Sequence, residues 1–202
     1  MMRSSLLALF LSGVLATPAF ADAVTDRIDR AFALYRDGAL ADAAIALGAA
    51  ALDVQTRLGN ALAEVMPTPP DGWQAGAAHV SAMGPIGGLT VSRDYRGADG
   101  VMDAAVVVGS PAVAGVASLI GEPGVLATQP GLRLVRLGDR DALLRWEPST
   151  RSGQVMTVLG QTVLVQVVGR GVADGEELVA LMRAWDLSAV AARAGVAEPN
   201  GN

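Results

Sequence analysis

The sequence contains no cysteine. This absence excludes a disulfide scaffold, a thiolate zinc site, a cysteine nucleophile and a lipidated N-terminal cysteine. Lysine is also absent, because all 15 basic residues are arginine, which excludes a Walker lysine and a Schiff-base lysine. His79 is the single histidine and by itself cannot build a histidine metal centre. We therefore predict no cofactor, no metal site and no assembled catalytic set.

Aromatic residues are scarce at 4%, and acidic residues outnumber basic ones by 20 to 15. An acidic chain without a basic stripe binds nucleic acid poorly, because neutralised phosphates supply most of that affinity. Hydrophobic residues reach 51%, but two uncharged apolar runs that raise this share, 104–121 and 152–169, are interrupted by Ser110-Pro111 and Gly160-Gln161. We therefore predict no nucleic-acid partner, and we interpret the two runs as a strand plus helix and as a hairpin.

Residues 1–21 have the features of a signal peptide. Arg3 provides a basic start, an apolar core follows from Leu6 to Ala16, and 19–21 (Ala-Phe-Ala) forms a small-x-small cleavage pattern. We predict cleavage after Ala21 and a periplasmic or secreted location. The missing cysteines favour the bacterial periplasm over a eukaryotic secretory route.

Residues 22–66 have helical periodicity and predict an antiparallel helical hairpin. Apolar residues from Val24 to Tyr35 recur at helical spacing, Gly38 ends the first helix, and a second helix runs from Leu40 to Pro67. The stretch LYRDGALADAAIALGAAAL resembles the centre of a tetratricopeptide repeat. In that resemblance Gly38 occupies the turn, Leu40 a large-residue position, and Ala43 and Ala50 the small positions of the second helix. Only one half-repeat matches, which implies a hairpin with repeat-like packing.

Three prolines within 67–70 predict an extended linker at 67–73, because proline cannot continue a helix. An α+β domain is expected at 74–195 and a disordered tail at 196–202. Asp174, followed three residues later by Glu177, predicts the start of a closing helix. Alternating apolar runs separated by turn residues predict strands at 89–96, 101–108, 132–137, 142–147, 154–159 and 162–168, with a helix from Pro111 after the second of them.

The predicted fold class is α+β, with an N-terminal helical hairpin followed by an antiparallel sheet of about six strands packed with helices like an α/β/α sandwich. This order of elements over residues 70–194, with its extended PPDGW entry and a strand ending at Tyr95, resembles the superfamily of the extrinsic photosystem subunit P and its exported bacterial relatives. The resemblance implies a domain that binds proteins or small ligands, usually without catalysis. It carries over no functional residue.

The leading functional hypothesis is an exported, non-enzymatic accessory or binding protein. We expect the hairpin to dock a protein partner, because the predicted second helix is longer than a small sheet needs for cover. The residues of its apolar stripe that we expect to bind the partner are Leu40, Leu47, Val54 and Leu58. If the strands place Arg133 and Arg145 on one face, these two would add a contact for an acidic partner or an anionic lipid headgroup.

Two alternatives stay open. The sheet domain could bind an apolar small molecule or lipid between sheet and helices, and a peripheral membrane contact is compatible with that role. The chain could also be a small enzyme that uses Asp94, Asp103 or His79, which predicts that these residues meet in one concave pocket. The glycine-rich GPIGG at 84–88 lacks the spacing and lysine of a phosphate loop and precedes a strand, so it is interpreted as a plain loop.

Overall fold

The computed structural model describes residues 22–82, 84, 88–126 and 128–197. The predicted signal peptide at 1–21 and the tail beyond 197 lie outside the described residues, as do 85–87 of the GPIGG loop. The elements are α1 (Ala23–Arg36), α2 (Leu40–Ala63), β1 (Gln74–Ala82), β2 (Leu89–Arg96), β3 (Val101–Val108), α3 (Ala112–Gly121), α4 (Pro123–Leu126), β4 (Leu132–Leu137), β5 (Arg140–Glu147), η1 (Pro148–Thr150), β6 (Ser152–Leu159), β7 (Val163–Arg170), α5 (Gly175–Arg183) and α6 (Leu187–Arg193).

The helical hairpin forms from α1 and α2, as the periodicity predicts. Asp22 caps α1 by accepting a hydrogen bond from the backbone N–H of Val24. Gly38 makes the turn at φ +77°, a backbone conformation that favours glycine. Ala31, Ala43 and Ala50 are buried, and their small side chains let the two helices approach closely.

Seven strands form one sheet in the order β1-β2-β3-β7-β6-β5-β4, and every neighbouring pair is antiparallel. Six of them match the predicted strands within two residues at each end. β1 is an additional edge strand that the sequence pattern does not predict. The two uncharged runs become β3 plus α3 and the β6–β7 hairpin. Within the described part of the chain, no helix combines the length and hydropathy that a membrane span requires.

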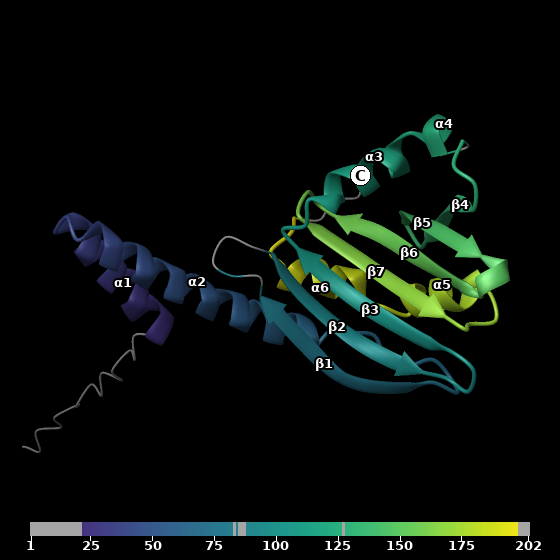
Figure 1. The fold of residues 1–202 in the computed structure, drawn as a ribbon, viewed down its shortest axis with the longest axis horizontal. Coiled ribbons are helices and arrows are strands. Elements are labelled where there is room, and N and C mark those ends of the chain that lie inside the picture. The colour runs from purple at the N-terminus through teal and green to yellow at the C-terminus, as the bar shows by residue number, and fades with distance from the viewer. Residues whose placement is uncertain (1–21, 83, 85–87, 127, 198–202) are drawn as a thin grey trace, which may run out of the picture.

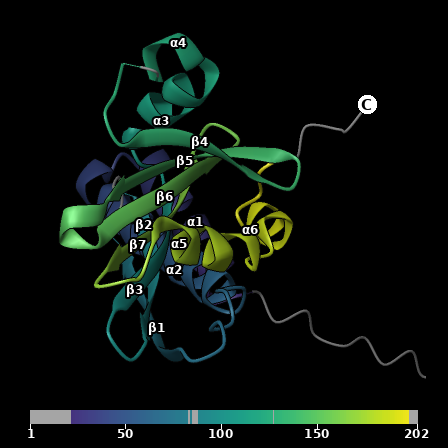
Figure 2. The same cartoon turned by 90° about the vertical axis from the view of Figure 1, so that its right-hand side faces the viewer.

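Helices pack on both faces of the sheet, which confirms the α+β class (Figures 1 and 2). On one face α5, α6 and the C-terminal end of α2 cover the larger core, which includes Val165, Leu178 and Leu181. On the other face α3 and α4 cover a smaller core around Val113, Leu143 and Leu164. Asp174 caps α5 as predicted, with its carboxylate accepting from the N–H groups of Glu176 and Glu177.

The end of α2 belongs to the sheet domain and not to a separate module. Leu62 and Met66 are buried in the larger core, so the boundary expected at residue 66 falls inside the packed domain. The hydroxyl of Tyr95 on β2 donates to the Pro67 carbonyl at 2.6 Å, and the indole N–H of Trp185 donates to the Val65 carbonyl at 2.8 Å. Burial raises the pKa of Tyr95 to about 12, so this phenol stays protonated and remains a donor.

Candidate functional sites

The apolar stripe of α2 continues beyond the sheet that covers it. Leu62 is fully buried and Leu58 packs against the edge of the larger core. Further toward the N-terminus the same stripe is exposed, with Val54, Leu47 and Leu40 accessible by 48%, 52% and 61%. The hairpin end of α2 projects past the sheet (Figure 1), so none of the described helices and strands of the sheet domain covers these three side chains.

Helix α1 adds a second exposed stripe next to the first. Ile28, Phe32 and Tyr35 recur at helical spacing and are exposed by 46%, 60% and 63%. The buried Ala31 and Ala43 face the neighbouring helix, and helical geometry then places both exposed stripes on the same side of the hairpin. We call this surface the apolar flank, formed by Ile28, Phe32, Tyr35, Leu40, Leu47 and Val54.

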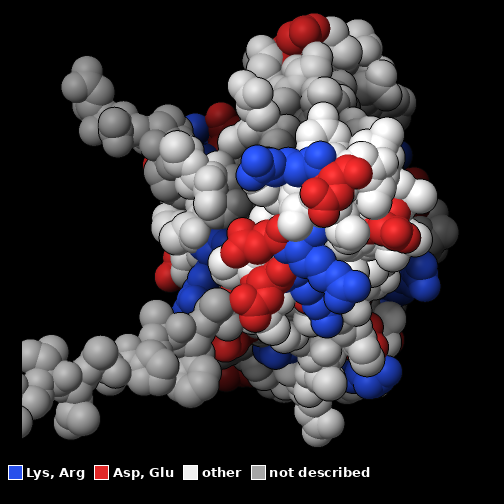
Figure 3. All heavy atoms as spheres, turned by 90° about the vertical axis from the view of Figure 1, so that its left-hand side faces the viewer, with Lys and Arg blue, Asp and Glu red and all other residues white. Residues whose placement is uncertain are grey.

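The opposite side of the hairpin mixes charged and apolar residues. A groove of about 400 Å³ runs there between the helices, and its lining combines Arg27, Arg30 and Asp42 with the apolar Leu34, Ile45, Ala46 and Ala49. Arg27 pairs with Asp53 at 2.6 Å, and Arg57 pairs with Asp22. Figure 3 looks at the molecule from the hairpin end and shows acidic and basic side chains interleaved, without a large patch of one sign. Charge therefore gives this end little selectivity, and its main unsatisfied surface is apolar.

The predicted partner-binding residues separate into different places. Leu40, Leu47 and Val54 lie on the apolar flank, whereas Leu58 is partly covered by the sheet domain. Arg133 and Arg145 do not share a face, because Arg145 pairs in register with Leu132, the neighbour of Arg133, and adjacent strand residues point to opposite faces. Arg133 is bound by Glu176 of α5 at 2.7 Å. The condition for a joint arginine surface, that both residues lie on one face of the sheet, is therefore not met.

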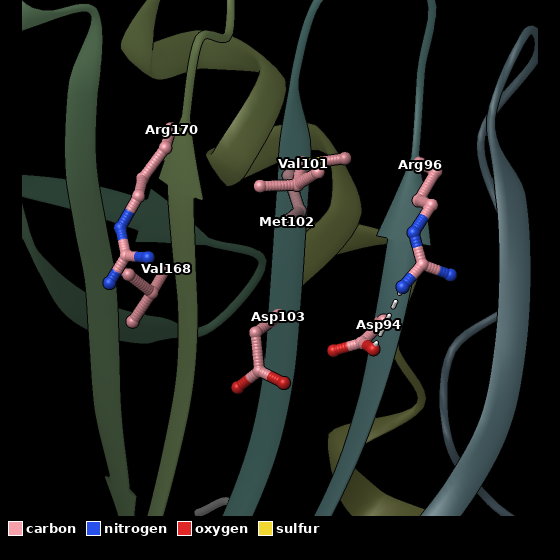
Figure 4. Close-up of a pocket in the computed structure, with 7 residues that line it drawn as sticks. All are labelled: Asp94, Arg96, Val101, Met102, Asp103, Val168 and Arg170. Carbon is pink, nitrogen blue, oxygen red and sulfur yellow. Dashed lines mark ion pairs between the residues drawn. The ribbon is translucent and has the colours of Figure 1, made fainter.

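A hollow of about 400 Å³ lies on the open half of the sheet face that α3 partly covers. Leu164 of β7 packs under α3, and Val168 and Arg170 follow on the same face beyond the helix. The carboxyls of Asp94 on β2 and Asp103 on β3 stand opposite each other in register, and Figure 4 shows them side by side below Val101 and Arg96.

The closeness of the two carboxyls affects the pKa of Asp103. Desolvation raises the pKa of Asp103, and Asp94 raises it further through its charge and through a hydrogen bond between the two side chains. The charge of His79 on β1 acts in the opposite direction. Arg96 pairs with Asp94 at 3.5 Å. The structure therefore gathers Asp94 and Asp103 in one hollow, and places His79 on the same face at the exposed edge strand, opposite Ser92.

A second hollow of about 300 Å³ adjoins the first and shares Val168 and Arg170 with it. Arg145 of β5 and Gln154 of β6, which pair in register, also line it. No hydrogen bond or ion pair joins the side chains of Arg145, Gln154 or Arg170 to another described residue. The sequence analysis missed Gln154 and Arg170. Their signal in the sequence was weak: only half of the residues on this face of β6 and β7 are polar, among them Gln166 beside Gln154 and Arg170.

No group of three or more potential metal-ligating side chains occurs among the described residues. Comparison with known proteins gives no match, whether to protein-family models, to curated proteins or to solved structures. The resemblance to the photosystem subunit P superfamily stays a prediction. The functional inference below rests on the two surfaces just described, the apolar flank and the open sheet face.

Replacing Asp103 by asparagine tests the electrostatics of the carboxyl pair. Because the folded chain binds the Asp103 proton more tightly than the unfolded chain, wild-type stability falls as pH rises from the ordinary value of 3.8 through the raised pKa. Asp103→Asn lacks this loss, so at neutral pH we expect its Tm to exceed that of the wild type by about 1–3 °C, a small rise because water screens a half-exposed carboxyl.

The measurement is thermal unfolding followed by circular dichroism at neutral and at acid pH. The advantage of Asp103→Asn should disappear below pH 3.8, where the wild-type carboxyl is protonated in both states. Asp71→Asn, at an exposed loop position outside the carboxyl pair, serves as the control for the loss of one surface carboxyl. An advantage that stays equal at all pH values would mean that packing, not ionisation, distinguishes the variant.

Proposed function

We propose that this chain is an exported, non-enzymatic accessory protein that docks a protein partner through the apolar flank of its hairpin. The observation that carries the proposal is the continuous stripe on α2, buried at Leu62 and open from Val54 to Leu40. Monomeric proteins rarely leave large apolar side chains contiguous and uncovered unless the surface binds something.

The composition of the flank supports a protein partner. Tyrosine and other aromatic residues are enriched at the buried centres of protein interfaces. The described part of the chain holds a single phenylalanine, Phe32, and two tyrosines, Tyr35 and Tyr95. Phe32 and Tyr35 lie exposed on the flank, while Tyr95 is buried in the domain. A chain this poor in aromatic residues thus places two of them where a partner would cover them.

The shape of the flank suits a helix of the partner. The two exposed stripes run along neighbouring antiparallel helices, and the shallow groove between such helices accepts the apolar face of a third helix. The repeat-like packing of Ala43 and Ala50 agrees with this arrangement, since hairpins of that kind are normally covered by the next helix of their array. The partner would supply that missing helix.

The sharpest test uses substitutions and not removal of the hairpin. Deleting residues 22–66 would also remove Leu62 and Met66 from the larger core and would unfold the domain. The double variant Phe32→Ser with Leu47→Ser changes two flank residues without touching that core. Ile45→Ser with Leu52→Ser is the matched control, because these side chains are exposed by 72% and 40% on α2 and lie outside the flank.

The experiment is affinity capture from periplasmic extract followed by titration of the captured protein against each variant. We expect the flank variant to bind the partner at least about thirtyfold more weakly, the effect of losing a central interface contact, and the control variant to bind like wild type. Equal weakening in both variants, or undiminished binding by the flank variant, would contradict the proposal. Analytical ultracentrifugation of the same set shows whether the partner is a second copy of this chain.

A further inference from the structure

The two hollows on the open sheet face form one trough with charges separated along it. At one end stand the guanidinium groups of Arg145 and Arg170, and at the other stand the carboxyls of Asp94 and Asp103. Val168 lies between them as an apolar floor and belongs to both hollows. Figure 4 shows the carboxyl end and Arg170 across the strands β2, β3 and β7.

The basic end offers donors that nothing in the described chain uses. The side chains of Arg145, Gln154 and Arg170 line the second hollow without a hydrogen-bond or ion-pair partner among the described residues. Glu147 also lines this hollow, but its carboxylate accepts from the backbone N–H and the hydroxyl of Ser149. Two guanidinium groups with a side-chain amide between them match the planar oxygens of a carboxylate.

The acidic end offers acceptors for a donor or a cation. An ammonium group placed between the two facing carboxyls could donate a hydrogen bond to each of them, because it has several N–H donors. Arg96 pairs with Asp94. Its positive charge therefore offsets the charge of Asp103 less than that of Asp94. The six charged residues of the trough sum to zero, with three arginines (96, 145, 170) against Asp94, Asp103 and Glu147. A neutral trough with opposite ends complements a ligand that is itself a zwitterion.

The sheet geometry sets the length of that ligand. The midpoint of Asp94 and Asp103 lies between β2 and β3, Arg170 is on β7, and Arg145 is on β5. At about 4.8 Å between strands, the ammonium and carboxylate positions are about 7 Å apart with the carboxylate over β7 at Arg170, and about 12 Å apart with it over β6, midway to Arg145. An extended chain spans about 3.3–3.6 Å per residue, so two residues cover the shorter distance, and three residues, at about 10–11 Å, reach the longer one with a small movement of the arginine side chains.

We propose that the trough binds a short zwitterionic peptide of two or three residues, with its terminal carboxylate held by Arg145 and Arg170 and its terminal ammonium held between Asp94 and Asp103. This role is independent of the apolar flank, because the trough residues lie on the sheet and none belongs to the hairpin. The pair of carboxyls acts here as a cation site and not as a catalytic acid and base.

The test is a titration of the purified protein with trialanine, followed by isothermal calorimetry and by backbone amide shifts. Trialanine with a free amine and a free carboxylate should bind, and shifts should fall on the strands that line the trough, β2, β3, β5, β6 and β7. N-acetyl-trialanine and trialanine amide should each bind at least about tenfold more weakly, the loss expected for one charge-assisted contact. Equal binding of the blocked and free peptides, or no binding of any of them, would overturn the proposal.

Substitutions test the same assignment from the protein side. Arg170→Gln and Asp103→Asn should each weaken trialanine binding at least about tenfold, while Arg133→Gln should leave it unchanged, because Arg133 projects from the opposite face and pairs with Glu176. Wild-type affinity should also fall as acid protonates the carboxyl pair. If Arg133→Gln weakens binding as much as Arg170→Gln, peptide binding would reflect general charge and the trough assignment would be wrong.

Discussion

Leu62→Ala is expected to destabilise the protein by about 3 kcal/mol, the middle of the range for removing a buried leucine. Leu62 is fully buried where α2 meets the sheet, so alanine leaves a cavity between helix and sheet that neither element closes. For a chain of this size the Tm should fall by about 6–12 °C. The measurement is unfolding in urea together with thermal unfolding.

Leu47→Ala is the matched control for this prediction. Leu47 belongs to the same apolar stripe of the same helix but is 52% exposed, so the stability change should stay within about 0.5 kcal/mol. The pair of variants therefore separates the buried part of the stripe from the exposed part by stability alone. A large loss in Leu47→Ala would mean that the flank is covered within this chain, and the docking proposal would lose its basis.

Gly153→Ala is the second substitution with a large expected effect. A methyl group at Gly153 would press against the carbonyl oxygen of Arg145 and lie 2.8 Å from Cε3 of Trp146. The oxygen belongs to the backbone of β5 and cannot turn away, so the strands β5 and β6 must separate. We expect a loss of about 2–3 kcal/mol, as for overpacking at a tight contact, measured by urea unfolding.

Gly115→Ala provides the opposite case with the same change of residue. Gly115 lies inside α3, and nothing stands within 4 Å of the added methyl group. Because alanine has the higher helix propensity, this variant should be more stable by about 0.5–1 kcal/mol. Destabilisation by Gly153→Ala that is no larger than the effect of Gly115→Ala would show that the β5–β6 contact is looser than described.

The sequence predicts the elements that carry strong periodicity or clear turn chemistry. The hairpin, the six alternating strands and the capped α5 all have such signals, so their existence and type were predictable. β1 was not, because its residues QAGAAHVSA are mostly small and exposed on both faces, and such residues have little strand propensity of their own. β1 forms because β2 pairs with it and because Val80 packs against Gly59 of α2.

The candidate sites, too, could be predicted from the sequence only in part. The stripe on α2 is visible in the sequence, but its exposure depends on where the sheet ends, and that is a property of the packed domain. Arg145 and Arg170 are separated by 24 intervening residues and share a hollow only because β5, β6 and β7 are neighbours. Arg133 and Arg145 lie on opposite faces because of the register between β4 and β5, which a sequence pattern does not determine.

The attachment of α2 has a mechanical consequence. The helix has 24 residues, a rod about 36 Å long at 1.5 Å per residue. The chain that leaves its C-terminal end is tied at Pro67 to Tyr95 of β2 and at Val65 to Trp185, which follows α5. Force applied to the tip of the hairpin is therefore transmitted into the middle layer of the domain and not into a loose tether. Because α2 is anchored in the sheet domain at this end, a partner bound at the tip of the hairpin would move together with the sheet and stay at a fixed distance from the trough.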